Sequence, residues 1–292
     1  MDQLGISKRF LSYIYERFNL VTYPLFILAI FFSAIALANV KFSLVFLLLP
    51  ILLFLYFLRI RIYDDIKDYK IDVKLRPNRP LPRGLVNKRE LLILTWILLI
   101  IELIIILILS LNLLIFYLLV VFFTLITYRE FFIGNFLRKN ILLYALPHVL
   151  IMSVISMYTY YAITYLSSMP FKLNIFILFG IITYLLGLFF EISRKMSGIY
   201  EKKHVKESFT VSLGFIPAWF LLISVFTLLI SFLLFFKWSF LIFNYIPVFF
   251  LFLMLLFRPC LFKKLSQKRA EFLGGVLMLY ILIIIILGGY YG

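Results

Sequence analysis

Residues 63–72 read Tyr63-Asp-Asp-Ile-Lys-Asp-Tyr-Lys-Ile-Asp72 and directly follow an apolar run that ends near Leu58. On a helix, Asp64, Asp68 and Asp72 lie on one face, each about 6 Å along the axis from the last. Carboxylates at this spacing repel one another unless a cation holds them. Hard cations such as Mg²⁺ bind carboxylate oxygens and keep positions open for substrate phosphates. The stretch therefore predicts a phosphate-handling metal site at a membrane boundary.

The composition indicates a polytopic membrane protein, because hydrophobic residues make up 65% of the chain. A membrane-spanning helix needs about 20 consecutive apolar residues. We therefore expect an all-α protein that forms a single integral-membrane domain over residues 1–292, with no separate soluble part. The nine predicted spanning helices are 20–38, 43–63, 91–110, 112–132, 141–165, 173–192, 210–233, 239–257 and 272–290.

The basic residues fall on one side of this predicted topology. If the amino terminus is cytoplasmic, 26 of the 29 lysines and arginines lie in inside segments, ten of them from Arg59 to Arg89. Only Lys41, Lys172 and Lys237 lie outside. This bias follows the positive-inside rule and explains the net charge of +16 without nucleic acid as a partner. It predicts a multi-pass protein of the plasma membrane with its carboxyl terminus outside. The single cysteine, Cys260, excludes an internal disulfide.

A proline-rich loop, Lys74-Leu-Arg-Pro-Asn-Arg-Pro-Leu-Pro-Arg-Gly84, follows the aspartates. Its three prolines cannot continue a helix, so the loop is expected to be stiff. It presents Arg76, Arg79 and Arg83, whose guanidinium groups suit phosphate oxygens. The alternative is a positively charged loop that contacts lipid head groups, but the neighbouring aspartates favour a phosphate site.

A second polar cluster lies in Phe190-Glu-Ile-Ser-Arg-Lys-Met-Ser-Gly-Ile-Tyr-Glu201. Glu191, Arg194 and Lys195 share one helical face at positions i, i+3 and i+4. Two interpretations remain open for this cluster. Either the glutamate pairs internally with the two cations at a helix end, or it binds metal while the cations contact phosphate oxygens.

Three further titratable residues lie near or inside predicted helices. Glu130 follows a helix end, where interfacial Tyr and Arg are common but an acid is not, so it is a candidate for lining a site. His148 follows Pro147 and is more typical of a core histidine than of a catalyst. Glu102 is an intramembrane acid far from the cytoplasmic residues. We expect it to be protonated or hydrogen-bonded to a neighbouring helix.

The first motif resembles that of the UbiA superfamily of intramembrane prenyltransferases. That family has nine spanning helices, and its first motif reads Asn-Asp-x-x-Asp-x-x-x-Asp, followed by Arg-Pro-x-Arg-Pro and a Gly. The matching residues here run from Asp64 to Asp72 and from Arg76 to Gly84. The leading Asn is replaced by Asp64, which can still bind metal. Spacing, proline loop and position after the second helix all agree.

The second motif departs from the family pattern, which is Tyr-x-x-Lys-x-x-x-Asp-x-x-x-Asp at the end of the sixth helix. Tyr184 and Glu191 align with the Tyr and the first Asp. Gly187 takes the place of the Lys, and Lys195 takes the place of the second Asp. A bacterial branch of the family is similar, with a Glu-x-x-Arg-Lys second motif. The departure implies fewer metal ions, with Lys195 supplying positive charge directly.

The resemblance implies a bundle around a central cavity that opens to the cytoplasmic side and the membrane. It implies Mg²⁺-dependent transfer of a prenyl group from a polyprenyl diphosphate to an unknown acceptor, with membrane lipids as further partners. The expected roles fall into three sets that partly overlap. They are metal ligands (Asp64, Asp65, Asp68, Glu191), diphosphate contacts (Arg76, Arg79, Arg83, Arg194, Lys195) and catalytic residues (Asp68, Asp72, Lys195). Asp72 would orient a cation or help deprotonate the acceptor.

Two other functions fit parts of the sequence. A CDP-alcohol phosphotransferase would also have acidic residues at the membrane, but the Asp-Gly and Ala-Arg steps of that motif are missing here. A transporter, or a relative that binds prenyl lipids without turning them over, is compatible with the altered second motif. Transporters usually have polar or broken helices at mid-membrane, whereas these helices are almost wholly apolar away from the cytoplasmic end.

Overall fold

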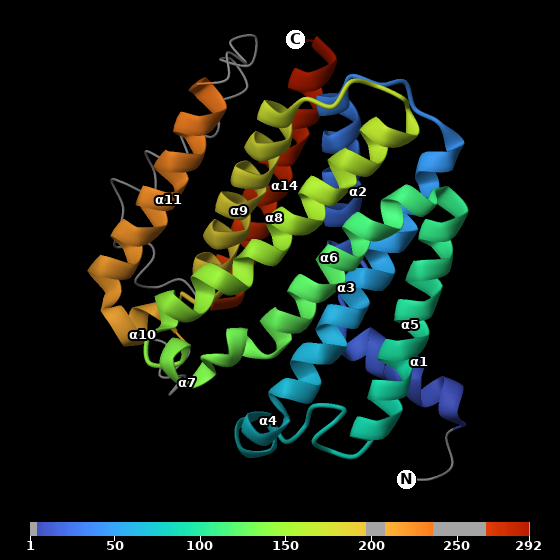
Figure 1. Ribbon diagram of the computed structural model, residues 1–292. Helices are drawn as coiled ribbons and strands as arrows, with labels where there is room; N and C mark the ends of the chain where they lie inside the picture. The colour runs from blue at the N-terminus through green and yellow to red at the C-terminus, as the bar shows by residue number, and fades with distance from the viewer. Residues whose placement is uncertain (1–4, 197–207, 236–266, 292) are drawn as a thin grey trace. The chain divides into compact units, whose positions relative to one another are not determined.

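The computed structural model describes residues 5–196, 208–235 and 267–291 (Figure 1). All regular structure in these ranges is helical, so the all-α prediction is confirmed. The predicted helix 239–257 and Cys260 lie outside the described residues. The helices of ten or more residues are α1 (Ile6–Arg17), α2 (Thr22–Ala38), α3 (Leu48–Lys67), α5 (Lys88–Leu109), α6 (Leu111–Tyr128), α8 (Ile141–Leu166), α9 (Leu173–Arg194), α11 (Phe215–Phe235) and α14 (Gln267–Tyr291). Shorter elements are η1 (Leu44–Leu47), α4 (Tyr69–Leu75), η2 (Glu130–Phe132), α7 (Gly134–Leu137) and α10 (Phe209–Leu213).

Six described segments are long and apolar enough to cross a membrane, which makes this a multi-pass membrane protein. They are Leu44–Lys67, Lys88–Leu109, Leu111–Tyr128, Ile141–Leu166, Leu173–Arg194 and Phe215–Leu233. Helices α1 and α2 meet at 71° and bring the count to seven if the bent pair is one span. The predicted count of nine for the whole chain stays a prediction.

The chain divides into two compact units, each described by itself below. Unit 1 comprises Met1–Leu28 and Phe42–Tyr128, and unit 2 comprises Ala29–Lys41 and Arg129–Gly292. In unit 1, α3 packs against α5 and α6 (Figure 1). Helix α5 begins with a capping box, because the Asn87 side chain accepts from the Glu90 amide at 2.8 Å and the Glu90 carboxylate accepts from the Asn87 amide at 2.9 Å.

A fully buried ion pair joins α3 to α5 inside unit 1. Arg59 Nε donates to Glu102 Oε1 at 2.9 Å, and Arg59 Nη2 lies 2.8 Å from Glu102 Oε2. Tyr117 of α6 donates a third hydrogen bond to Oε2 at 2.7 Å. The predicted hydrogen bond from Glu102 to a neighbouring helix is therefore confirmed. Arg59 lies inside α3 and has no exposed surface, and its ion pair with Glu102 was not predicted from the sequence.

In unit 2, α8 and α9 approach closely at small residues. Ser153 Oγ donates to the Gly180 carbonyl oxygen at 2.5 Å. A Cβ atom at Gly187 would lie 2.8 Å from Cγ1 of Val149. Close approach of this kind is common between membrane helices, where packing rather than the hydrophobic effect drives association. Helix α14 packs on α9 in the same way, since a Cβ atom at Gly274 would lie 2.7 Å from the Cβ of Ser193.

Candidate active site

The acidic segment keeps its helical register through a break. Helix α3 ends at Lys67 and α4 begins at Tyr69. Across the break, the Asp68 amide donates to the Asp64 carbonyl oxygen and the Asp72 amide donates to the Asp68 carbonyl oxygen, both at 2.9 Å. The three aspartates therefore stay one turn apart, as the sequence predicted.

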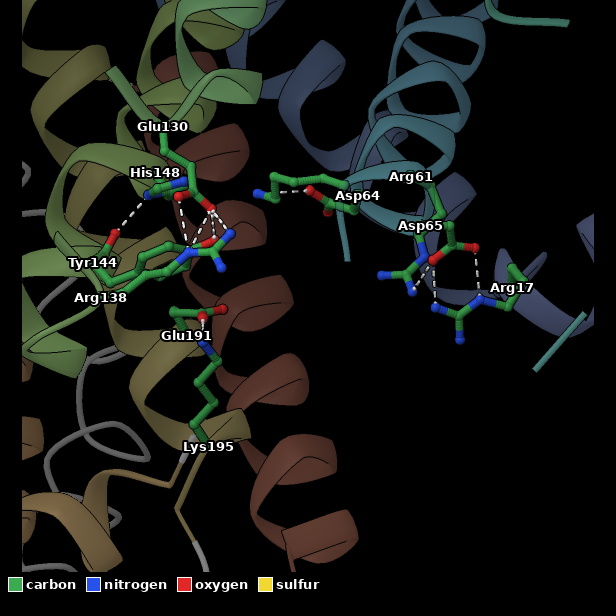
Figure 2. Close-up of polar contacts among 11 residues, drawn as sticks. Arg17, Arg61, Asp64, Asp65, Glu130, Arg138, Tyr144, His148, Glu191 and Lys195 are labelled. Atoms are coloured by element: carbon green, nitrogen blue, oxygen red, sulfur yellow. Dashed lines mark hydrogen bonds and ion pairs between the residues drawn. The ribbon is translucent and has the colours of Figure 1, made fainter. Parts of the chain in front are cut away.

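Asp65 is held on both of its carboxylate oxygens by other side chains of unit 1 (Figure 2). Arg17 of α1 donates to Oδ2 at 2.8 Å and to Oδ1 at 2.5 Å. Tyr13 donates to Oδ2 at 2.9 Å, and Arg61 donates to Oδ1 at 3.0 Å. The carboxylate is buried, so these contacts attach α1 to α3. Its predicted role as a metal ligand stays a prediction.

Asp65→Asn is expected to loosen α1, because the amide cannot pair with both arginines. A hydrogen bond to a charged group contributes about 1.5–3 kcal/mol, so amide exchange in residues 6–17 should accelerate by about tenfold or more. Hydrogen exchange followed by mass spectrometry measures this rate. Asp64→Asn, a half-exposed neighbour on the same helix, is the matched control and should leave α1 unchanged. The contrary outcome is that amide exchange in residues 6–17 stays as slow in Asp65→Asn as in wild type, while the protein needs a higher Mg²⁺ concentration for its activity. That result would show that Asp65 is a metal ligand.

Asp72 fixes two arginines of the proline loop. Its side chain is buried, and its two oxygens lie 3.1 Å from Arg76 Nη1 and 2.5 Å from Arg79 Nη1. Of the two roles predicted for this aspartate, the contacts favour orientation of cations. Arg83 lies elsewhere, on the exposed Glu16, with Nη–Oε distances of 2.8 and 2.5 Å. These hydrogen bonds raise the pKa of the Arg83 guanidinium.

A cavity of about 380 Å³ opens beside this loop within unit 1. Its lining includes Arg76 and Arg79 from the loop, together with Glu16 and Arg17 from the end of α1. The lining holds three arginines against one acid, Glu16, which favours an anionic ligand. The sequence did not single out Arg17, because nothing in its own segment links it to the aspartates 48 residues later.

The second motif lies in unit 2, at the end of α9. Glu191 is 2.5 Å from Arg194 Nη2 and 2.8 Å from Lys195 Nζ. The internal pairing that the sequence allowed is therefore present. Tyr184, which aligns with the tyrosine of the family motif, donates from its hydroxyl to the Leu146 carbonyl oxygen of α8 at 3.2 Å.

The donor atoms of the acidic segment fit Mg²⁺. Asp64 and Asp68 offer carboxylates one turn apart, and Mg²⁺ is commonly bound by one or two carboxylates together with water and substrate phosphates. Among the described residues, no group of three or more Asp, Glu, His or Cys residues is arranged to hold a metal by itself. A site of this type would therefore depend on the phosphates of the substrate for its remaining ligands.

Comparisons with known proteins support the helical fold and the family resemblance of the sequence. The sequence matches the UbiA prenyltransferase family over residues 23–288. The fold is similar to a solved structure of digeranylgeranylglyceryl phosphate synthase, with a TM-score of 0.60, 15% identity, and coverage of 97% of this chain and 99% of that one. It is also similar to a UbiA homologue from Aeropyrum pernix K1 in its apo form, with a TM-score of 0.63, 18% identity, and coverage of 91% and 96%. A search among curated proteins found no match.

The family match covers most of the chain, and it includes both the acidic segment with its proline loop and the altered second motif. The solved structures support the same helical fold. The chain belongs to the UbiA prenyltransferase family.

Proposed function

We propose that this protein transfers a prenyl group from a polyprenyl diphosphate to an acceptor at the cytoplasmic face of the plasma membrane, in a Mg²⁺-dependent reaction. The observation that carries the proposal is the register of Asp64, Asp68 and Asp72, of which Asp72 binds Arg76 and Arg79, two of the three arginines that line the cavity of unit 1. Carboxylates for a metal and guanidinium groups for phosphate are the two parts that a diphosphate site needs.

Asp64 and Asp68 would hold Mg²⁺, with Asp65 and Glu191 as further proposed ligands. When bound, the metal neutralises charge that develops on the departing diphosphate. Both Arg76 and Arg79 are pre-positioned by Asp72, so their guanidinium groups need little reordering to contact phosphate oxygens. Arg83, Arg194 and Lys195 are proposed as further diphosphate contacts.

Ionisation of an allylic diphosphate breaks the bond between C1 and oxygen and leaves a carbocation-like carbon. The apolar surroundings of a membrane site exclude water that would capture this cation. Aromatic faces can stabilise it. The chain's part in the reaction is therefore to bind the diphosphate, to neutralise it and to keep the cation dry.

We also propose how the chain crosses the membrane. Nine spanning helices would form a single domain over residues 1–292 around a central cavity, with the amino terminus cytoplasmic and the carboxyl terminus outside. The placement of 26 of 29 basic residues in the predicted inside segments supports this orientation. Membrane lipids are the expected surroundings of the protein, and the acceptor is not assigned.

A non-catalytic protein that binds prenyl lipids is the second candidate. The specific observation that favours it is the pairing of Glu191 with its own Arg194 and Lys195, which compensates the charge of the carboxylate that would bind the metal. Binding of a prenyl diphosphate without release of pyrophosphate would support this candidate over the enzyme.

Purified protein with labelled geranylgeranyl diphosphate and a lipid extract from its own cells is expected to release pyrophosphate only when Mg²⁺ is present. Removal of divalent metal with EDTA should lower the rate by about a thousandfold, because a bound metal contributes several kcal/mol to such a reaction. Adding back excess Mg²⁺ should restore the rate, and this restoration is the internal control. Release that continues unchanged in EDTA would reject the mechanism.

A further inference from the structure

Two arginines of helix α1 point toward the rest of unit 1 and away from solvent. Arg9 Nη2 lies 2.7 Å from the Glu90 carboxylate of α5, and Arg17 binds Asp65 of α3. The Arg17 side chain is only 12% exposed. A helix on the surface of a water-soluble protein turns its charged face to solvent and its apolar face to the core. For these two arginines the orientation is the reverse of that arrangement.

The outward face of α1 is apolar instead. Phe10 and Ile14, and likewise Leu11 and Tyr15, are four residues apart, so the four side chains form one stripe along the helix. Leu11 is 66% exposed and Tyr15 is 79% exposed, whereas Phe10 and Ile14 are half-buried. The outer edge of the stripe is therefore turned away from the core of unit 1.

The exposed apolar surface continues past the end of α1. Leu20, Val21 and Leu25 are each about half exposed or more. They lead into α2, and none of the 17 residues of α2 carries a charge. The apolar stripe of α1 is thus followed directly by a helix that is apolar enough to enter the hydrocarbon core of a membrane.

The length of α1 and the bend that follows it limit how this helix can lie. Its 12 residues give a length of about 18 Å, which is too short to cross a hydrocarbon core of about 30 Å. Helix α1 meets α2 at 71°. When α2 runs along the membrane normal, α1 therefore runs close to the plane of the membrane.

We propose that α1 is an interfacial helix that lies in the headgroup region of one leaflet, with Leu11 and Tyr15 turned toward the acyl chains. A short helix with one charged face and one apolar stripe binds this region of a bilayer. Tyrosine is enriched there, because its ring is apolar and its hydroxyl is polar. Lys8 is exposed three residues before Leu11 and supplies a cation for lipid phosphates. This inference does not depend on the proposed transfer reaction.

The proposed lipid contact also bears on the cavity of unit 1. Glu16 and Arg17, at the end of α1, line that cavity. Lipid would hold α1 on its apolar face, while the ion pairs of Arg9 and Arg17 hold it on the other. Attachment to the bilayer therefore contributes to the position of Arg17 in the cavity wall.

Spin labels test this placement. A label is attached at Leu11→Cys or Tyr15→Cys in a Cys260→Ser background, and the protein is reconstituted in nanodiscs of phosphatidylcholine and phosphatidylglycerol. Oxygen concentrates among acyl chains, whereas the nickel complex NiEDDA stays in water. The ratio of the two collision rates, oxygen over NiEDDA, is expected to be at least about threefold higher at both positions than at Asn78→Cys in the exposed proline loop. A label at Ile100→Cys, exposed in the middle of α5, is the lipid reference.

A second measurement removes the apolar stripe. The double variant Leu11→Glu with Tyr15→Glu is expected to accelerate amide exchange of residues 6–17 in nanodiscs by about tenfold, because carboxylates leave the acyl boundary. The matched control is Leu11→Met with Tyr15→Phe, which keeps the stripe apolar and should exchange as slowly as wild type.

Three results overturn the inference. A collision ratio at Leu11 and Tyr15 as low as that at Asn78 shows that this face is open to water. Low collision rates with both reagents, together with dipolar broadening between labels, show that a second copy of the chain covers the face instead of lipid. Exchange as slow in the glutamate variant as in wild type shows that no lipid contact holds the helix.

Discussion

Asp68→Ala is expected to lower Mg²⁺-dependent pyrophosphate release by about a thousandfold or more. Asp68 lies at the junction of α3 and α4, one turn from both Asp64 and Asp72, so its loss removes the central carboxylate of the three. A metal that neutralises developing charge contributes several kcal/mol, and each 1.36 kcal/mol corresponds to a factor of ten in rate. Single-turnover release from labelled geranylgeranyl diphosphate measures the effect.

The control for this variant is Glu271→Gln, an exposed acid on α14 that has no proposed part in the reaction. It should release pyrophosphate at the wild-type rate. Raising the Mg²⁺ concentration separates two kinds of loss, because a weakened metal site recovers some activity whereas a misfolded protein does not. A wild-type rate in Asp68→Ala would exclude this aspartate from the metal site and with it the proposed mechanism.

Glu102→Ala is expected to destabilise the protein by about 3 kcal/mol, because it leaves the Arg59 guanidinium buried without its counter-ion. The loss also removes the acceptor of the Tyr117 hydroxyl. Unfolding in mixed detergent micelles, followed by circular dichroism, measures the change in free energy. The effect is large because neither Arg59 nor Glu102 has any exposed surface, so water cannot solvate the guanidinium group that is left without its partner.

Two comparisons make this stability prediction specific. Glu271→Ala removes an exposed acid and should change the free energy of unfolding by less than about 0.5 kcal/mol. The double variant Arg59→Leu with Glu102→Leu should regain much of the lost stability, since replacing a buried ion pair by apolar residues is often nearly neutral. If Glu102→Ala unfolds like wild type, the ion pair does not hold α3 to α5.

The helices were predictable because length and hydropathy alone set them. The spans at 91–110, 141–165 and 173–192 correspond closely to α5, α8 and α9. The end of α6 was missed, because the chain remains apolar through Phe131 and Phe132 while the backbone turns left-handed there. The Glu130 carboxylate of that turn pairs with Arg138, a contact that hydrophobic periodicity does not encode.

The acidic segment was predictable as a unit, but the partners of its members were not. Spacing placed Asp64, Asp68 and Asp72 one turn apart, and the backbone follows. Only the structure reveals that Asp65 is bound by Arg17 and Tyr13, because these residues come from a helix far away in the chain. The pairing of the buried Arg59 with Glu102 was not predicted either, since Arg59 lies next to a run of further basic residues in the sequence.

The close approach of Gly187 to Val149 constrains how this lineage can change. The family motif that the sequence resembles has a lysine at the aligned position, and a lysine introduced at residue 187 would meet Val149 of the facing helix first. Such a lysine is therefore expected to be tolerated only after position 149 has acquired a smaller residue, so that the two positions have to change in a fixed order.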